Sequence, residues 1–176
     1  MILQKVLLID TDYVKQYSTV SENMDAKYVT PCIVSSQVQD LQQLIGTPLS
    51  VKLCELVDDE TIDDSENAAY KDLLDEYVKP YLLACTQAEL IISNMMKIRR
   101  AGDVQFYDTS VQNADMKMIQ YQHQHYADQA TFLGNRMTDW LKCHMKDYPE
   151  YRQFCACKCD GMSPKPESSI NCPIVL

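Results

Sequence analysis

The residues with the most distinctive chemistry are three cysteines near the end of the chain. Cys155, Cys157 and Cys159 lie within five residues, and thiolates this close could hold a soft metal such as zinc. Cys172 or His144 could supply a fourth ligand. The usual structural zinc pattern, however, is two C-x2-C pairs, and neither is present. The spacing therefore favours plain thiols in an interaction segment over a metal site, with disulfide bonding as an alternative outside the cell.

The histidines and glycines give no catalytic pattern. His123 and His125 are two residues apart, so on a helix they point in different directions and cannot form a joint ligand pair. There is no H-E-x-x-H motif, and the four scattered glycines form no phosphate-binding loop. We therefore expect no enzyme activity, no metal and no cofactor.

An acidic stretch is the most strongly charged part of the chain. It carries six acids in nine residues: Asp58, Asp59, Glu60, Asp63, Asp64 and Glu66. A solvated loop explains such a run better than an ion site or a catalytic pair of carboxylates. The whole chain has a formal charge of -9, which makes it a poor candidate for gripping nucleic-acid phosphates. Like charge would still suit a passage through which DNA slides.

Targeting and redox features are few. The apolar start, residues 1–9, is short and runs directly into Asp10, unlike a secretory signal. No apolar run approaches the roughly 18 residues of a membrane helix, so we expect no membrane contact. Four cysteines fall at apolar-compatible positions of helical patterns, and we interpret them as reduced core residues. They are Cys32, Cys54, Cys85 and Cys143.

The first half of the chain predicts a series of short helices. Low glycine with many Leu, Met, Gln and Ala residues favours helix throughout. Thr11 is the expected N-cap of the first helix. Pro31 is expected to open a longer helix that stops at Gly46, and Thr47-Pro48 to open the next.

The second half predicts two long helices. The first runs from about Glu66 to Ala101, with a kink or break at Pro80. Residues 103–111 should form a loop or short hairpin, and the last helix should run from about 113 to 145. Its apolar stripe is wide and irregular, which favours packing on the protein's own helices over a coiled coil. The stripe comprises Ile119, Tyr126, Ala130, Leu133, Met137, Trp140, Leu141 and His144.

These patterns predict an all-α protein, a bundle of four to five helices with extended arms at its ends. We divide the chain into an N-terminal arm (1–10), a helical domain (11–152) and an extended C-terminal tail (153–176). The tail has almost no helical period and cannot bury enough surface to fold alone, so we expect it to lie on a neighbouring molecule. Its expected contact residues are Phe154, Pro164, Pro166, Pro173, Ile174, Val175 and Leu176.

The spacing of residues over 11–152 resembles the head–tail connector (ring or neck adaptor) proteins of tailed bacteriophages, and most closely the ring proteins of crAss-like phages. A first matching block lies in 11–57 and a second in 70–82. The matching residues are Asp12-Tyr13-Val14-Lys15, Tyr17-Ser18, Asn23, Asp25, Lys27-Tyr28, Pro31, Ile33, Gln37, Leu41, Gly46, Leu49 and Leu53, then Tyr70-Lys71-Asp72-Leu73-Leu74, Tyr77, Pro80, Tyr81 and Leu82.

The resemblance implies a structural virion protein. It would form a dodecameric ring between portal and tail, made in the host cytoplasm and located at the head–tail junction. Its partners would be further copies of itself, the portal protein and other neck, ring or tail proteins, while DNA passes through without specific binding. The acidic stretch would then face the lumen or rim. Two alternatives stay open: a small helical regulator or scaffold acting as monomer or dimer, and a metal or redox protein built on residues 155–159.

Overall fold

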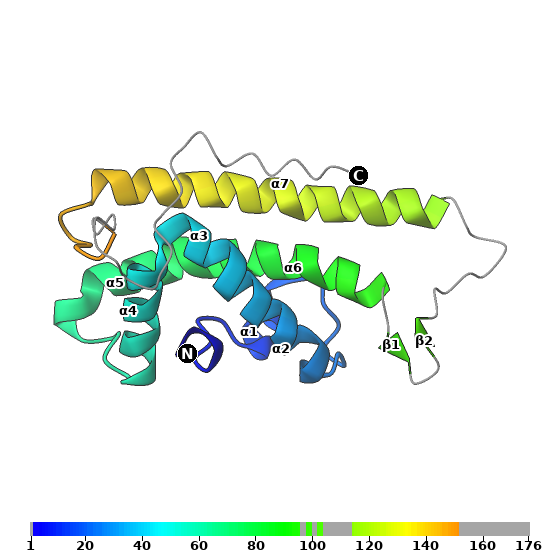
Figure 1. Cartoon of the computed structure of the whole chain (residues 1–176), viewed down its shortest axis with the longest axis horizontal. Helices are drawn as coiled ribbons and strands as arrows, with labels where there is room; N and C mark the ends of the chain where they lie inside the picture. The colour runs from blue at the N-terminus through cyan, green and yellow to red at the C-terminus, as the bar shows by residue number, and fades with distance from the viewer. Residues whose placement is uncertain (1, 96–97, 100–101, 104–113, 152–176) are drawn as a thin grey trace.

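The computed structural model describes residues 2–95, 98–99, 102–103 and 114–151 (Figure 1). The fold is all-α, as the composition predicts, and the strands among the described residues are one antiparallel pair of two residues each. In chain order the elements are η1 (Ile2–Gln4), α1 (Thr11–Tyr17), α2 (Ala26–Ser35), η2 (Ser36–Leu41), α3 (Gln42–Ile45), α4 (Thr47–Asp58), η3 (Ser65–Asn67), α5 (Ala68–Leu73), η4 (Leu74–Val78), α6 (Lys79–Met95), β1 (Ile98–Arg99), β2 (Gly102–Asp103) and α7 (Ala114–Cys143).

Helix α6 is the centre of the molecule. Helix α7 runs antiparallel along one side of it, and α2 with η2 packs on another side (Figure 1). Leu82 of α6, Ile33 of α2 and Leu141 of α7 are all fully buried in one continuous core. The predicted packing of the last helix on the protein's own helices is therefore confirmed.

Two prolines lie inside continuous helical rods, which corrects the expected helix boundaries. Pro31 does not open a helix, because α2 already begins at Ala26, where the side chain of Asp25 accepts a hydrogen bond from the Lys27 backbone N–H. At Pro80 the helical rod does not break, because η4 runs directly into α6. The wide π-turn of η4 precedes it, with the Lys79 N–H bonded to the Leu74 carbonyl. A wider turn accommodates a residue that has no N–H and whose ring crowds the preceding turn.

Other boundaries differ from the expected ones by a few residues. Asp10, not Thr11, caps α1, and its carboxylate accepts the Tyr13 N–H at 2.7 Å. Gly46 does end one rod and precede the next, with a φ of 81° that glycine adopts at little cost. The long second rod ends at Met95 instead of Ala101, and the chain then pairs Ile98 with Asp103. The expected hairpin thus begins earlier, while residues 104–113 lie outside the described part of the chain.

The N-terminal segment is part of the core, which corrects its interpretation as an extended arm. Residues Ile2–Gln4 form a turn of 3-10 helix, and Leu3 and Leu8 are buried. The fully buried side chain of Gln37 binds this segment through three backbone groups: its Nε2 donates to the Leu3 and Val6 carbonyls, and its Oε1 accepts from the Leu8 N–H. A buried amide that satisfies backbone groups replaces the water they would otherwise need.

The cysteine expectation is confirmed at three of four positions. Cys32, Cys54 and Cys85 are buried, whereas Cys143 is exposed. Leu141 already faces the core, and a residue two further along a helix points roughly 200° away from it. Burial raises the pKa of both the Cys54 and the Cys85 thiol from 9.0 to about 12, which makes them unreactive near neutral pH.

Candidate interaction surface

The described residues contain no cluster of three or more His, Cys, Asp or Glu side chains that could hold a metal ion. The predicted thiols Cys155, Cys157, Cys159 and Cys172 lie outside these residues, so the metal hypothesis is untested there. His144 has a different role: its ring stacks on Trp140 with centroids 4.4 Å apart. In the described part of the chain, no helix is long and apolar enough to cross a membrane.

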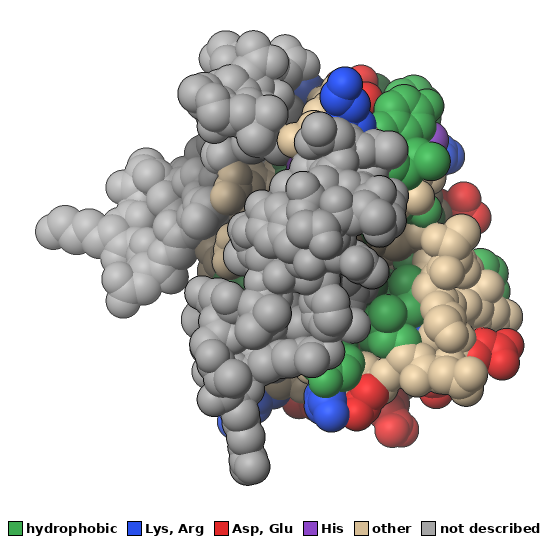
Figure 2. All heavy atoms as spheres, turned by 90° about the vertical axis from the view of Figure 1, so that its right-hand side faces the viewer, with side chains coloured by type: hydrophobic (Ala, Val, Ile, Leu, Met, Phe, Trp, Pro, Cys, Tyr) green, Lys and Arg blue, Asp and Glu red, His purple; other side chains and the backbone are tan. Residues whose placement is uncertain are grey.

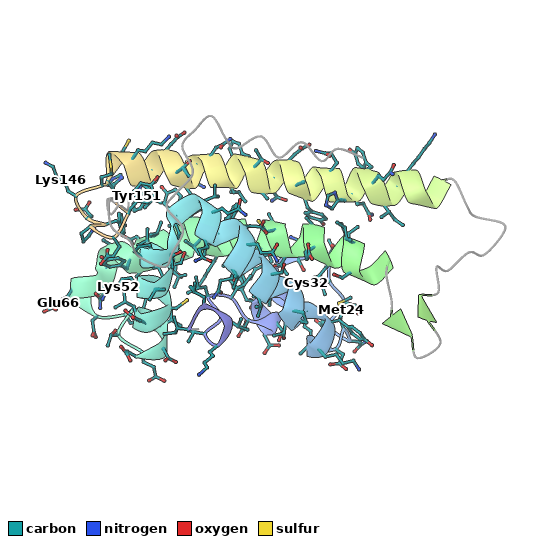
Figure 3. The ribbon with its side chains drawn as sticks, viewed as in Figure 1. Met24, Cys32, Lys52, Glu66, Lys146 and Tyr151 are labelled. Atoms are coloured by element: carbon teal, nitrogen blue, oxygen red, sulfur yellow. The ribbon has the colours of Figure 1, made fainter. Side chains whose placement is uncertain are left out.

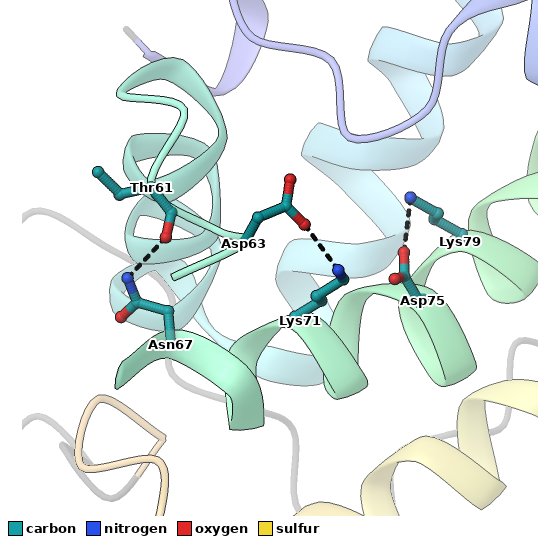
Figure 4. Close-up of polar contacts among 6 residues, drawn as sticks. All are labelled: Thr61, Asp63, Asn67, Lys71, Asp75 and Lys79. Atoms are coloured by element: carbon teal, nitrogen blue, oxygen red, sulfur yellow. Dashed lines mark hydrogen bonds and ion pairs between the residues drawn. The ribbon is translucent and has the colours of Figure 1, made fainter. Parts of the chain in front are cut away.

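The acidic stretch is exposed, as predicted. All six of its acids are exposed: Asp58 is the last residue of α4, and the other five lie between α4 and α5. Lys71 forms an ion pair with Asp63 at 2.7 Å, and this hydrogen bond holds the pKa of the Asp63 carboxyl below its usual value (Figure 4). The backbone is fixed beside it, because the Asn67 side chain donates to the Thr61 carbonyl at 2.8 Å. These contacts order the loop while leaving its negative charge open to solvent.

Where the described fold ends is relevant to the predicted tail. The last described residue, Tyr151, is buried at the same end of the molecule as Glu66 and Lys146 (Figure 3). All of the predicted contact residues of the tail lie beyond it, outside the described residues. They are Phe154, Pro164, Pro166, Pro173, Ile174, Val175 and Leu176.

An aromatic cluster fixes the C-terminal half of α7 at that end. Trp140 stacks on Tyr77 of η4 with ring centroids 4.7 Å apart, and Tyr148 lies 5.3 Å from it. The fully buried Tyr148 also donates its hydroxyl to the Ala69 carbonyl at 2.7 Å and meets the Tyr70 ring edge-on. Offset and edge-on ring pairs add to the stabilisation from burial, so this half of α7 is firmly held.

The outer face of α7 is different, because large apolar side chains face solvent there. Met118, Tyr121 and Phe132 are exposed by 59%, 72% and 68%. At 100° per residue these three positions fall within about 60° of helix circumference, on the side away from the buried Met137 and Leu141. His125 and Asp128 are exposed and fall on nearly the same line. We call these five residues the outer row.

The outer row was not found by sequence reasoning. The inner stripe has more apolar residues, so it dominates the pattern of this helix. The signal that could have found the second stripe is the spacing of its apolar residues. Tyr121 and Phe132 follow Met118 by three and fourteen residues, and both separations return to nearly the same side of a helix. In Figure 2, hydrophobic side chains lie on the outside of the molecule at its upper edge, the level at which α7 runs in Figure 1. Helix α7 is thus apolar on two faces, and the described residues cover only one of them.

The comparisons with known proteins place the chain in a family without assigning a function. A model described as a family of unknown function (DUF6712) matches residues 41–161, about two thirds of the chain. The chain belongs to this family. The matched region runs from the end of η2 through α7 and includes the outer row and the thiols at 155–159. The search of curated proteins found no match, and neither did the search of solved structures.

Proposed function

We propose that this chain is a structural subunit that assembles with copies of itself into a ring, and that the ring joins the portal to the tail of a tailed phage. The observation that carries the proposal is the outer row. Three large apolar side chains are held in water on a rigid helix, and such a patch typically marks a protein–protein contact. The resemblance of residues 11–152 to phage neck adaptors supplies the particular assembly.

The opposite faces of α7 support an assembly role. The inner face anchors the helix through Trp140, Tyr148 and the core, so the outer row is presented on a rigid element. A preorganised contact surface loses less conformational entropy on binding than a flexible one does. Ring closure further requires that each subunit offer two different, complementary surfaces, related by a rotation that closes.

The charge distribution agrees with a channel-lining subunit. Six exposed acids on an ordered loop would repel DNA phosphates and let the duplex slide without binding. The same negative charge makes identical subunits repel one another at close range. Ring formation would therefore need counterions or a basic surface on a partner. In the proposed setting the portal is that partner, and assembly waits until it is present.

The mass of the assembly tests this function. Purified full-length chain is measured by light scattering and native mass spectrometry, alone and with the portal protein of the same phage. We expect a closed ring of identical subunits on the portal, consistent with a dodecamer. A chain that stays monomeric or dimeric and does not bind the portal would instead support a small helical regulator or scaffold.

A matched pair of variants links that assembly to α7. Tyr121→Ser with Phe132→Ser removes two exposed rings from the outer row, and Gln120→Ser with Thr131→Ser changes two exposed positions on another side of the helix. The first pair should reduce ring formation on the portal, and the second should not. Equal assembly by both variants would exclude the outer row as the contact surface.

A further inference from the structure

We propose that the outer row of α7 is the docking site for residues 170–176 of a neighbouring copy of this chain. The inference deepens the proposed ring function by naming the two surfaces that meet. It rests on four properties of the chain: the side-chain alternation of 170–176, its length, the proline within it, and the distribution of charge.

The first property is the alternation of side chains in the sequence INCPIVL. An extended segment points alternate residues to opposite sides. Ile170, Cys172, Ile174 and Leu176 would therefore share one side, and all four are apolar. A segment with this pattern has one apolar face when it is extended. The pattern does not favour a helix in which the segment could bury that face against itself.

The second property is length. From Met118 to Phe132 the helix rises about 21 Å at 1.5 Å per residue. Residues 170–176, when extended, span about 20 Å at roughly 3.3 Å per residue. The apolar side of the segment thus matches the distance between the two ends of the outer row. Met118 and Tyr121 lie at one end of the row and Phe132 at the other, with His125 and Asp128 between them.

The third property is Pro173, which decides how the segment would bind. Proline has no N–H to donate, so it is excluded from the middle of a sheet. The described residues also contain no longer strand that could accept a partner, since β1 and β2 have two residues each. Docking through side chains on a helix does not require that N–H. The outer row therefore fits this segment better than strand addition does.

The fourth property is charge. It favours contact between this segment and a neighbouring copy over contact between residues 1–152 of two copies. Residues 153–176 contain two lysines, Lys158 and Lys165, and two acids, Asp160 and Glu167, so their formal charge is zero. The whole chain has 16 basic and 25 acidic residues, so residues 1–152 have 14 and 23 and carry the full -9. A neutral apolar segment can therefore approach the acidic residues 1–152 of a neighbouring copy without electrostatic repulsion. Residues 1–152 of a second copy would be repelled.

The reach of the chain allows the segment to leave its own subunit. Tyr151 lies at the end of the molecule where α7 ends, and 19 residue steps separate it from Ile170. Those steps can extend to roughly 63 Å, longer than the roughly 45 Å length of α7. Because the row and the segment are different surfaces of one chain, their contact is head-to-tail, the kind that a ring requires.

Photo-cross-linking in the full-length chain tests the site and identifies its occupant. Tyr121→p-benzoylphenylalanine places the reactive group in the outer row, and Gln120→p-benzoylphenylalanine is the control on another side of α7. Each variant is made unlabelled, mixed with an equal amount of 15N-labelled chain, irradiated and mapped by mass spectrometry. We expect position 121, and not position 120, to cross-link to residues 170–176, with pairs that combine labelled and unlabelled chains.

Three outcomes would overturn the proposal. Cross-links found only within single chains would show that a subunit's own segment fills its row. Cross-links from position 121 to another region would give the row a different occupant. Absence of any cross-link to 170–176 would leave the segment without this site. Light scattering on the same mixture separates the two proposals: an oligomer without the cross-link contradicts the docking site but leaves the ring function standing.

The alternation gives a second test within the segment. Ile174→Ala with Leu176→Ala removes two side chains from the proposed apolar side and should lower the cross-link yield roughly tenfold or more. Val175→Ala, on the opposite side of an extended segment, should leave the yield close to that of the unmodified segment. An equal loss from both changes would contradict the one-sided contact.

Discussion

The buried amide of Gln37 accepts a hydrogen bond from the backbone N–H of Leu8 at 3.0 Å, across 29 residues of sequence. The same side chain donates to the Leu3 carbonyl at 2.9 Å and to the Val6 carbonyl at 2.8 Å. One glutamine therefore joins the N-terminal segment to the rod formed by α2, η2 and α3. Since each of these groups would be costly to leave unpaired in the core, the segment and the rod stabilise each other.

Gln37→Leu should destabilise the fold by about 2–4 kcal/mol, because it leaves two carbonyls and one N–H without partners. Urea unfolding followed by circular dichroism measures the change. Gln39→Leu is the matched control, an exposed glutamine of the same π-helical stretch, and it should change stability by less than about 0.5 kcal/mol. Equal stability of the two variants would mean that the N-terminal segment is not held in the way described.

Gly134 lets α7 approach α3 and α6 closely. A Cβ at this position would lie 2.9 Å from Leu44 Cδ1 and 3.1 Å from Tyr81 Cε2. Gly134→Val should therefore cost about 1–3 kcal/mol of unfolding free energy, the range for overpacking a core. Asn135→Val, one residue along the exposed side, should lose less than about 1 kcal/mol from helix propensity alone. A neutral Gly134→Val would contradict the close approach of α7.

The buried thiols predict a loss of stability at alkaline pH. Burial raises the pKa of Cys54 and of Cys85 from 9.0 to about 12, so folding favours the protonated thiols. Their contribution to stability is complete below the unfolded value near 9 and decreases as pH rises from there toward 12. Burial also raises the pKa of Tyr70 and Tyr148, which adds a change of the same sign.

Urea midpoints measured between pH 8 and pH 11 check this dependence. We expect these midpoints to fall as pH rises. In a variant carrying Cys54→Ala and Cys85→Ala, the fall should be less steep when each protein's midpoints are expressed relative to its own value at neutral pH. The exposed Cys143 provides a second readout, since it should react with a thiol reagent at neutral pH while Cys54 and Cys85 stay protected. A midpoint independent of pH over this range would count against the burial of the two thiols.

The acidic stretch should be dispensable for folding. Replacing its four aspartates with asparagine and its two glutamates with glutamine removes charge from exposed side chains and breaks the Asp63–Lys71 pair. We expect the helical circular dichroism signal to stay unchanged, while DNA passage or assembly on the portal changes. Loss of the helical signal would refute the placement of these acids on an open surface.

Much of the fold follows from local sequence signals. The long α7 with its inner stripe, the glycine stop at Gly46 and the start of α4 at Thr47 are confirmed, because each depends on a spacing or a backbone preference within a few residues. The errors have a common origin. Pro31 was expected to open a helix and Pro80 to kink or break one, but both prolines lie inside continuous rods, each of which contains a π-helical stretch.

The surfaces were harder to predict than the helices. Exposure of the acidic stretch could be predicted, since six charges in nine residues cannot be buried. The N-terminal segment was misjudged because its partner, Gln37, lies 29 residues away from Leu8 and no local pattern indicates a pairing. The outer row was missed for a related reason. Only the position of α6 shows which apolar face of α7 is covered and which is left in solvent.

Labelling of whole phage particles tests the central claim most directly. An antibody against this chain, bound to the particles that carry it and imaged by electron microscopy, should mark the junction between head and tail. Quantitative mass spectrometry of the same particles should give a copy number consistent with a dodecamer. Label on another part of the particle, or particles that contain none of this chain, would contradict the proposed ring.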